Sequence, residues 1–158
     1  MLGVAGTADI EQATAESVRL LVELSQEFYV AEGYPFDQRT VRSALHQLVD
    51  DGTHGQVWLI RAEGLVVGYA TVTYGFSVEF GGRFALLDEF YIRPTARNGG
   101  LGKSSLHFLL DEYSRRGFGA MRLEVEHRNS RAAGLYSRLG FHRHERSLMT
   151  TWLTTQLS

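Results

Sequence analysis

The sequence LDEFYIRPTARNGGLGKS, residues 87–104, decides the fold that we expect for this chain. Its first six residues end an apolar and aromatic run from Arg83 to Ile92, which predicts a strand. Glycines at positions 99, 100 and 102 interrupt this pattern, and apolar residues at helical spacing follow from Leu106 to Tyr113. This order of strand, glycine-rich turn and helix leaves the first backbone N–H groups of the helix free to bind an anion.

The segments on either side alternate between helical and strand patterns. We predict helices over 15–31, from a cap at Asp37 to a break at 50–53, and over 130–139, and strands over 10–13, 57–61, 65–74, 121–126 and 148–153. This order of elements predicts a mixed α/β (α+β) fold with a central sheet. The length suits one domain, which we take to span residues 1–158.

The composition excludes several classes of protein and site. The formal net charge of -2 is too close to neutral for a nucleic-acid-binding surface. The chain has no cysteine, which excludes disulfides, thiolate-metal sites and a cysteine nucleophile. No apolar run approaches the roughly 20 residues of a membrane span, and Met1 to Gly6 do not resemble a signal peptide, so we expect a cytoplasmic protein without membrane partners. The histidines give no metal-binding pattern, and we predict no metal.

The glycine-rich loop suits a pyrophosphate group. Arg97 adds a permanent positive charge with forked donors beside glycines that let the backbone approach a phosphate. A P-loop NTPase is a remote alternative, because Gly102-Lys103-Ser104 resembles the end of that motif. The P-loop needs glycine five positions before its Gly-Lys pair, and that position is Arg97. The glycine spacing also differs from that of a dinucleotide-binding fingerprint.

Several motifs along the chain, taken in order, resemble the GNAT superfamily of N-acetyltransferases. Arg97-x-x-Gly100-x-Gly102 matches the Arg/Gln-x-x-Gly-x-Gly/Ala signature with which that family binds coenzyme A. The strand Leu87 to Pro94 resembles the central strand of the family. The second half resembles it at Leu123-Glu124-Val125, Asn129, Leu135-Tyr136, Gly140-Phe141 and the final strand at Leu148-Met149. The similarity covers roughly residues 8–155.

The resemblance implies a fold, a cofactor and a reaction. The fold is a mostly antiparallel sheet with a splay between two central parallel strands, flanked by about four helices. The reaction is direct transfer of the acetyl group from acetyl-CoA to a primary amine. The residues implied in binding acetyl-CoA are Phe90, Tyr91, Ile92, Arg97, Asn98, Gly99, Gly100, Leu101, Gly102, Lys103, Ser104 and Asn129. Asn98 departs from the glycine usual in the family, but asparagine tolerates positive φ better than most residues.

Three residues are candidates for catalysis. Tyr136 matches the general acid of the family, which protonates the thiolate of coenzyme A. The amine, with a pKa of about 10.4, needs a base, for which Asp88 and Glu89 are candidates acting through water. Because these two are adjacent on a strand, we expect their side chains to point to opposite faces, so that only one serves.

The acceptor is expected between the first two helices and the splayed strands. Tyr29, Glu32, Tyr34 and Asp37 fall in that helix-turn-helix, and Glu79 lies in the hairpin between Phe76 and Gly82. Carboxylates beside aromatic rings suit a cationic amine, either a small polyamine-like or amino-sugar acceptor or the amine of a protein. A homodimer is a further expectation, because relatives are often dimers. A non-catalytic acyl-CoA-binding sensor on the same fold is the alternative.

Overall fold

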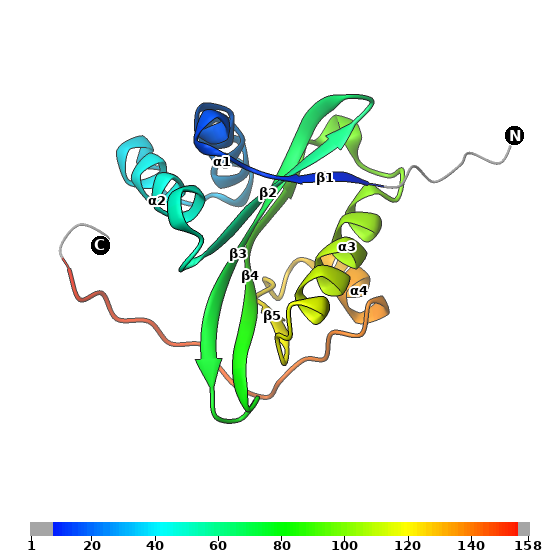
Figure 1. The fold of residues 1–158 in the computed structure, drawn as a ribbon. Helices are drawn as coiled ribbons and strands as arrows, with labels where there is room; N and C mark the ends of the chain where they lie inside the picture. The colour runs from blue at the N-terminus through cyan, green and yellow to red at the C-terminus, as the bar shows by residue number, and fades with distance from the viewer. Residues whose placement is uncertain (1–7, 155–158) are drawn as a thin grey trace, which may run out of the picture.

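The computed structural model describes residues 8–154 and consists of one sheet with helices on both faces (Figure 1). Helices α1 and α2 cover one face of the sheet, and α3 and α4 cover the other. The elements are β1 (Asp9–Gln12), η1 (Ala15–Ser17), α1 (Val18–Glu32), α2 (Gln38–Asp51), β2 (Gly55–Ala62), β3 (Leu65–Ser77), β4 (Gly82–Ile92), η2 (Pro94–Ala96), α3 (Leu101–Arg115), β5 (Met121–Leu123) and α4 (Ser130–Arg138). The predicted mixed α/β fold is confirmed.

The sheet has five strands in the order β1-β2-β3-β4-β5, and all neighbours are antiparallel except β4 and β5. Strand β5 runs parallel to β4, but the pairing extends only from Ala85 opposite Met121 to Leu87 opposite Leu123. Beyond these pairs β4 continues to Ile92 while β5 has ended. The expected splay between the parallel strands is therefore present, and it begins after Leu87.

The predicted last strand is the main error of the sequence analysis. Residues 141–154, which include the predicted strand 148–153, form neither helix nor strand. The predicted strand 121–126 is also shorter than expected, because pairing with β4 stops at Leu123. Within residues 8–154, β5 is thus the edge of the sheet rather than a central strand. An extended segment becomes a strand only where a neighbouring strand accepts its backbone hydrogen bonds, and residues 141–154 have no such neighbour here.

Local signals explain where the first two helices end and begin. Gly33 adopts a left-handed conformation, with φ of 73°, and ends α1. Asp37 caps α2, because its carboxylate accepts a hydrogen bond of 2.7 Å from the backbone N–H of Thr40. The Asp37 cap agrees with the sequence analysis, and α1 ends at Glu32, one residue beyond the expected limit at position 31. Among the described residues, none of the helices is long and apolar enough to cross a membrane.

Each face of the sheet has its own hydrophobic core. Leu21, Leu24 and Tyr69 are fully buried between the sheet and the α1–α2 pair. Leu106, Leu109 and Tyr113 belong to the core beneath α3, where the indole Nε1 of Trp58 donates a hydrogen bond of 3.1 Å to the Tyr113 hydroxyl. The two cores hold the helices at fixed positions over β4, the strand that carries the predicted site.

We expect Tyr113→Phe to lower the free energy of unfolding by about 1–3 kcal/mol, because it leaves the buried Trp58 donor without an acceptor. Urea unfolding monitored by tryptophan fluorescence measures the change. Tyr34→Phe is a matched control, since its hydroxyl makes a 3.3 Å bond to Glu126 at an exposed position. Equal losses in the two variants would contradict the assignment of the Trp58–Tyr113 bond to the core.

Candidate active site

An extra residue in β4 determines how the acidic side chains lie. Strand β3 pairs Thr71 with Glu89 and Val72 with Leu87, so Asp88 is opposite no residue of β3. Such a β-bulge shifts the alternation of side chains along the strand. Leu87 packs into the core beneath α3, whereas Glu89, two residues later, faces the α1–α2 side and accepts a hydrogen bond from the Tyr69 hydroxyl.

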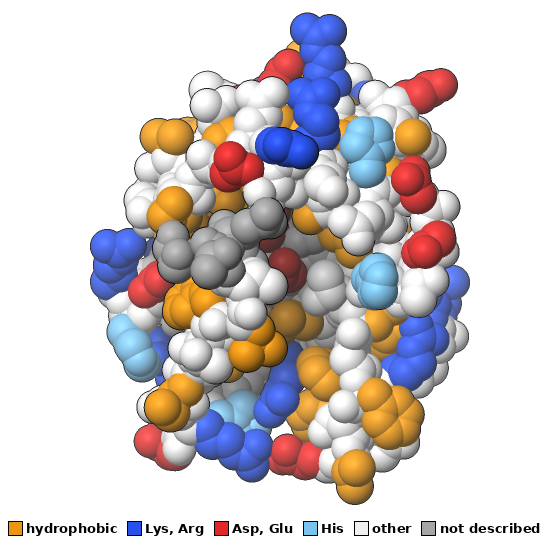
Figure 2. All heavy atoms as spheres, turned by 90° about the vertical axis from the view of Figure 1, so that its left-hand side faces the viewer, with side chains coloured by type: hydrophobic (Ala, Val, Ile, Leu, Met, Phe, Trp, Pro, Cys, Tyr) orange, Lys and Arg blue, Asp and Glu red, His pale blue; other side chains and the backbone are white. Residues whose placement is uncertain are grey.

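The prediction that Asp88 and Glu89 point to opposite faces is wrong. Both line one cavity of about 140 Å³ on the α1–α2 side of the sheet. The bulge is the physical reason, because it places two consecutive residues of β4 toward the same side. Figure 2 looks onto this side of the molecule and shows acidic atoms in the floor of a hollow near its centre. The remaining residues that line the cavity are Tyr29, Thr40, Val41, Ala44, Leu45, Leu48 and Thr71.

Both carboxyl groups bind their protons more tightly than usual. Burial raises the pKa of Glu89, and the charge of Asp88 adds to this effect, while the hydroxyls of Tyr29 and Tyr69 oppose it. Partial burial of its carboxyl group also raises the pKa of Asp88, although the residue as a whole is exposed. A raised pKa moves a carboxylate toward the range in which it accepts a proton from an amine.

A third polar group of this cavity is the Thr71 hydroxyl. Thr71 is 2% exposed, and among the described residues its Oγ1 is a buried side-chain oxygen with no hydrogen-bond partner. Buried hydroxyls nearly always have a partner, because leaving one unsatisfied costs about 1–3 kcal/mol. Thr71 is paired with Glu89 and lines the cavity, and its hydroxyl is shielded from solvent within the cavity wall.

The glycine-rich loop has the shape that the sequence predicts. Asn98 has φ of 71° and Gly100 has φ of 81°, so the backbone is left-handed at both positions. The tolerance of Asn98 for positive φ is thus confirmed. The Asn98 side chain also accepts a hydrogen bond from Arg131, which joins the loop to the first turn of α4. Arg97 donates from Nε to the carbonyl oxygen of Ile92 at 2.7 Å, so its guanidinium is held against the end of β4.

The start of α3 presents backbone donors beside open space. The first backbone bond within the helix runs from Ser104 N–H to the Gly100 carbonyl at 3.0 Å. The N–H groups of Leu101, Gly102 and Lys103 precede it and point out of the helix end. A Cβ atom added at Gly99 or Gly100 would meet no atom of residues 8–154 within 4 Å, so these residues leave open space beside both glycines. These groups fit a pyrophosphate.

The remaining predicted residues on the α3–α4 side come from β4 and α4. Phe90 and Tyr136 pack at the margin of the core beneath α3, while the Tyr91 hydroxyl points to the other face and donates to Glu27 at 3.3 Å. Asn129 caps α4, because its side chain accepts a 3.1 Å bond from Ala132 N–H. Burial raises the pKa of the Tyr136 phenol, and the charge of Glu32 raises it further.

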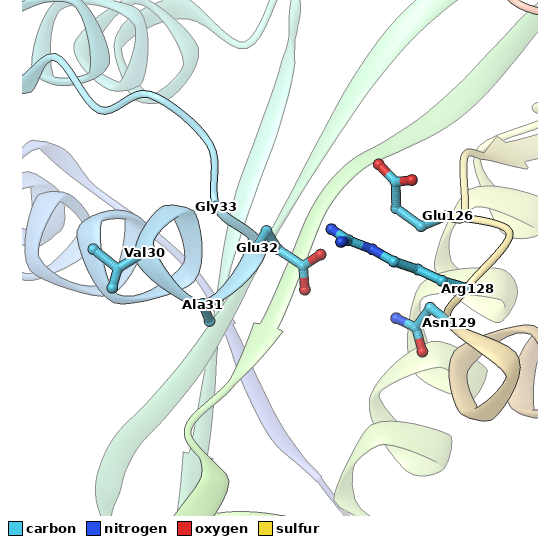
Figure 3. Close-up of a pocket in the computed structure, with 7 residues that line it drawn as sticks. All are labelled: Val30, Ala31, Glu32, Gly33, Glu126, Arg128 and Asn129. Atoms are coloured by element: carbon cyan, nitrogen blue, oxygen red, sulfur yellow. The ribbon is translucent and has the colours of Figure 1, made fainter.

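A second cavity, of about 460 Å³, lies between the end of α1 and the loop after β5 (Figure 3). Glu32 projects from the end of α1 toward Arg128, which extends from the opposite side (Figure 3). Tyr34 lies near this cavity, since its hydroxyl donates to Glu126 at 3.3 Å. The residues that line the cavity are Val30, Ala31, Glu32, Gly33, Glu126, Arg128 and Asn129.

The model of the Acetyltransferase (GNAT) family matches residues 18–141, which is most of the chain. The chain belongs to the GNAT family of acetyltransferases. A search of the curated proteins gave no match. The resemblance stated from the sequence is thus confirmed, and with it a reaction that uses acetyl-CoA.

Solved structures agree with the fold of this GNAT acetyltransferase. An integron cassette protein from the mobile metagenome of Cole Harbour Salt Marsh is 31% identical, with a TM-score of 0.83 over 98% of this chain and 95% of that one. A possible acetyltransferase from Clostridium difficile 630 is 18% identical, with a TM-score of 0.82 over 94% and 99%. A predicted acetyltransferase from Clostridium acetobutylicum, solved with acetyl-CoA, is 16% identical, with a TM-score of 0.77 over 91% and 96%.

The structure brings together most, but not all, of the predicted site residues of this acetyltransferase. Glu79 lines neither cavity and instead forms a 3.1 Å ion pair with Arg146 at the β3–β4 hairpin. The Ser104 hydroxyl donates within α3, to the Leu101 carbonyl at 3.1 Å. Asp37 is used as a helix cap.

The sequence analysis missed three groups of residues at the two cavities. These are Thr71, the apolar side chains of α2, and the two charged residues Glu126 and Arg128. The run Glu126-His127-Arg128 directly before Asn129 was a usable signal, because charged residues cluster there at the end of a strand. Thr71 gave no signal, because a threonine is common in strands.

We expect Glu89→Gln to raise the melting temperature at pH 7.5 and to leave it nearly unchanged at pH 3.5. The pKa of Glu89 is higher in the folded state than in the unfolded state. The folded state therefore loses stability as the pH rises from the unfolded-state pKa through the folded-state pKa, because the carboxylate then carries a buried charge. Glutamine carries no charge and keeps an acceptor for Tyr69. Differential scanning calorimetry at both pH values measures the effect, and Asp88→Asn, at a more exposed residue, should give a smaller increase. An equal gain at both pH values would contradict this origin.

Proposed function

We propose that this GNAT acetyltransferase transfers the acetyl group of acetyl-CoA directly to a primary amine held in the cavity between α1, α2 and β4. The observation that carries the proposal is the bulge at Asp88, which places two carboxyl groups in one small cavity beside the splay. The unpartnered hydroxyl of Thr71 is buried in the wall of the same cavity. The amine therefore meets proton acceptors at the place where β4 is no longer paired with β5. The cytoplasm stays the proposed compartment.

The pyrophosphate of acetyl-CoA is proposed to bind at the start of α3. The N–H groups of Leu101, Gly102 and Lys103 and the positive end of the helix dipole favour a doubly charged group there. Arg97, held against Ile92, adds a fixed positive charge. The contact between Asn98 and Arg131 keeps the loop close to α4, so the pantetheine arm extends between β4 and α4 toward Asn129.

The splay is proposed to polarise the thioester. Backbone N–H groups on the β5 side of β4, near Phe90 to Ile92, have no strand partner there within the described residues. An N–H group directed at a carbonyl oxygen stabilises the charge that develops on it during acyl transfer, by about 3 kcal/mol for one donor. Asp88 or Glu89 accepts the one proton that the amine loses, directly or through a water molecule, from the cavity on the α1–α2 side of the sheet.

Tyr136 is proposed to return a proton to the departing thiolate. Its raised pKa keeps the phenol protonated at neutral pH, as an acid must be. The same shift makes the phenol a weaker acid than usual, while the thiol of coenzyme A has a pKa near that of cysteine, about 8.5. Proton transfer therefore requires that the thiolate form within hydrogen-bond distance of the phenol. It also requires that the thiolate be buried from water, because burial raises the pKa of the thiol as it raises that of the phenol.

The volume and the lining residues of the small cavity limit the kinds of amine that can bind there. Its volume of about 140 Å³ equals only a few water molecules, each of which occupies about 30 Å³ in the liquid. Val41, Leu45 and Leu48 give it apolar walls above the two carboxylates. A primary amine on a short alkyl arm, as in a polyamine, matches both features, whereas the hydroxyls of an amino sugar would find few partners.

The wider cavity lined by Glu32 and Glu126 suits the rest of a polycationic acceptor. The two carboxylates there attract a second ammonium group of the same molecule, and Arg128 lines the same cavity. A protein amine is the second candidate for the acceptor, because this cavity opens to the surface with enough room for a peptide end. A non-catalytic acyl-CoA sensor would need neither the two acids nor the unpartnered Thr71 hydroxyl.

We expect free thiol to be released from acetyl-CoA when the enzyme is given diamines and polyamines. A thiol-reactive dye measures release against a panel that also contains amino sugars and peptides with a free N-terminus. Polyamines should give the highest kcat/KM. Tight binding of acetyl-CoA without thiol release with any amine would support the sensor instead.

Thr71→Val is the matched variant for the acceptor, because it keeps the shape of the side chain and removes the hydroxyl. We expect it to raise KM for the amine about tenfold, the value of one lost hydrogen bond, while KM for acetyl-CoA stays unchanged. A rise in KM for acetyl-CoA alone would place the acceptor elsewhere.

We expect Tyr136→Phe to lower kcat by about 10²–10⁴-fold, the usual contribution of a general acid, with little change in Kd for acetyl-CoA. Stopped-flow measurement of thiol release and calorimetric titration with acetyl-CoA separate the two quantities. The residual activity should no longer fall at the high pH at which the phenol of the wild-type enzyme ionises. An unchanged kcat would remove Tyr136 from the mechanism.

A further inference from the structure

An acidic residue of α1 contacts the end of β4 outside both cavities. Glu27 lies in α1 and is among the lining residues of neither cavity. Its carboxylate receives both arms of the Arg93 guanidinium, because Nε donates to Oε2 at 3.0 Å and Nη2 donates to Oε1 at 2.8 Å. These hydrogen bonds from Arg93 lower the pKa of Glu27, so the carboxylate is charged at neutral pH. A forked contact of this kind fixes the orientation of the guanidinium as well as its distance.

The same carboxylate also holds Tyr91. The Tyr91 hydroxyl donates to Glu27 Oε2 at 3.3 Å, and the residue is only 6% exposed. The side chains of Tyr91 and Arg93 thus both point toward α1. Ile92, between them, points to the other face, where its Cδ1 lies 3.8 Å from the position that a Cβ atom at Gly102 would take. Glu27 therefore fixes the residues on both sides of Ile92.

Ile92 is the point at which the glycine-rich loop is attached to β4. Arg97 donates from Nε to the Ile92 carbonyl oxygen at 2.7 Å. The Arg97 guanidinium also lies 5.7 Å from the centre of the Tyr91 ring, within the range of a cation–π contact. The Arg93 carbonyl accepts a 2.9 Å bond from Ala96 N–H, which closes the turn that leads into the loop. The contacts that fix the loop therefore end on the three residues that the α1 carboxylate holds.

We propose that Glu27 is a positioning residue for acetyl-CoA, which holds Tyr91 and Arg93 and through them keeps Arg97 in the geometry that binds the pyrophosphate. This inference rests on the proposed place of the pyrophosphate at the start of α3. Glu27 itself touches neither substrate and acts only through β4. Groups that recognise a ligand must be held within about 0.5 Å of their productive positions, so the side chains that support them affect affinity without contacting the ligand.

The structure separates this role from a general contribution to stability. Leu21 and Leu24 of α1 are fully buried in the core and hold the helix on the sheet without Glu27. The Glu27 and Arg93 side chains are 39% and 33% exposed, and ion pairs near the surface contribute little to the stability of a fold. We therefore expect variants at Glu27 to fold, and the loss of the ion pair to appear in the binding of acetyl-CoA.

Calorimetric titration with acetyl-CoA tests the role of Glu27. We expect Glu27→Ala to raise Kd about tenfold, the effect of a residue that acts through others on a binding site. Glu27→Gln keeps a side-chain oxygen for the same donors and should restore much of the affinity. Glu11→Ala is the matched control, because Glu11 forms a similarly exposed ion pair with Arg61, in strands that β3 separates from β4. An unchanged Kd in Glu27→Ala, or an equal rise in Glu11→Ala, overturns the proposal.

Arg97→Ala distinguishes failure of this role from failure of the proposed pyrophosphate site. Arg97→Ala should raise Kd for acetyl-CoA by itself. Because Glu27 acts through Arg97, the rise in the double variant should be smaller than the product of the two single rises. A rise equal to that product overturns the action through Arg97. If Arg97→Ala raises Kd and Glu27→Ala does not, the pyrophosphate site stands and the role of Glu27 is overturned. If neither variant changes Kd, the pyrophosphate binds elsewhere and both proposals are overturned.

Discussion

The unpaired residue Asp88 in β4 is the feature on which the candidate active site depends. Without it, the alternation that directs Leu87 toward α3 would direct Glu89 to the same face, away from Tyr69. With it, both acids reach the cavity beneath α2, and the end of the β4–β5 pairing at Leu87 falls directly before the bulge. One irregularity in one strand thus brings two carboxyl groups next to the backbone that is left unpaired by the splay.

Ionisable groups of the candidate site are buried from water. Their burial has opposite effects on the stability of the folded state and on their strength as bases. Burial raises the pKa of Glu89 and of the Tyr136 phenol, so both hold protons more firmly than in water. A charged carboxylate in such a place weakens the folded state, but it is a stronger base toward an amine. The apolar cores on both faces of the sheet, with the Trp58–Tyr113 hydrogen bond in one of them, stabilise the folded state and offset the cost of burying these ionisable groups.

Local signals predicted the parts of the structure that local physics decides. The helix limits at Gly33 and Asp37, the positive φ of Asn98 and the helix that starts beside Gly100 all follow from the preferences of single residues. Residues 148–153 were predicted wrongly for the same reason. They favour a strand, but a strand exists only beside a partner, and no other part of residues 8–154 pairs with them.

The sequence by itself determined the order of elements as far as α4, the glycine-rich loop from Arg97 to Lys103 and the family, because these depend on residue type and spacing along the chain. Only the tertiary structure decided that Asp88 and Glu89 share a cavity, that Thr71 stands unpartnered in its wall, and that Glu79 pairs with Arg146 instead of facing an acceptor. The physical reason is that a strand register, and the bulge within it, is fixed by pairing with a neighbouring strand and by packing of both faces. No short stretch of sequence contains that information.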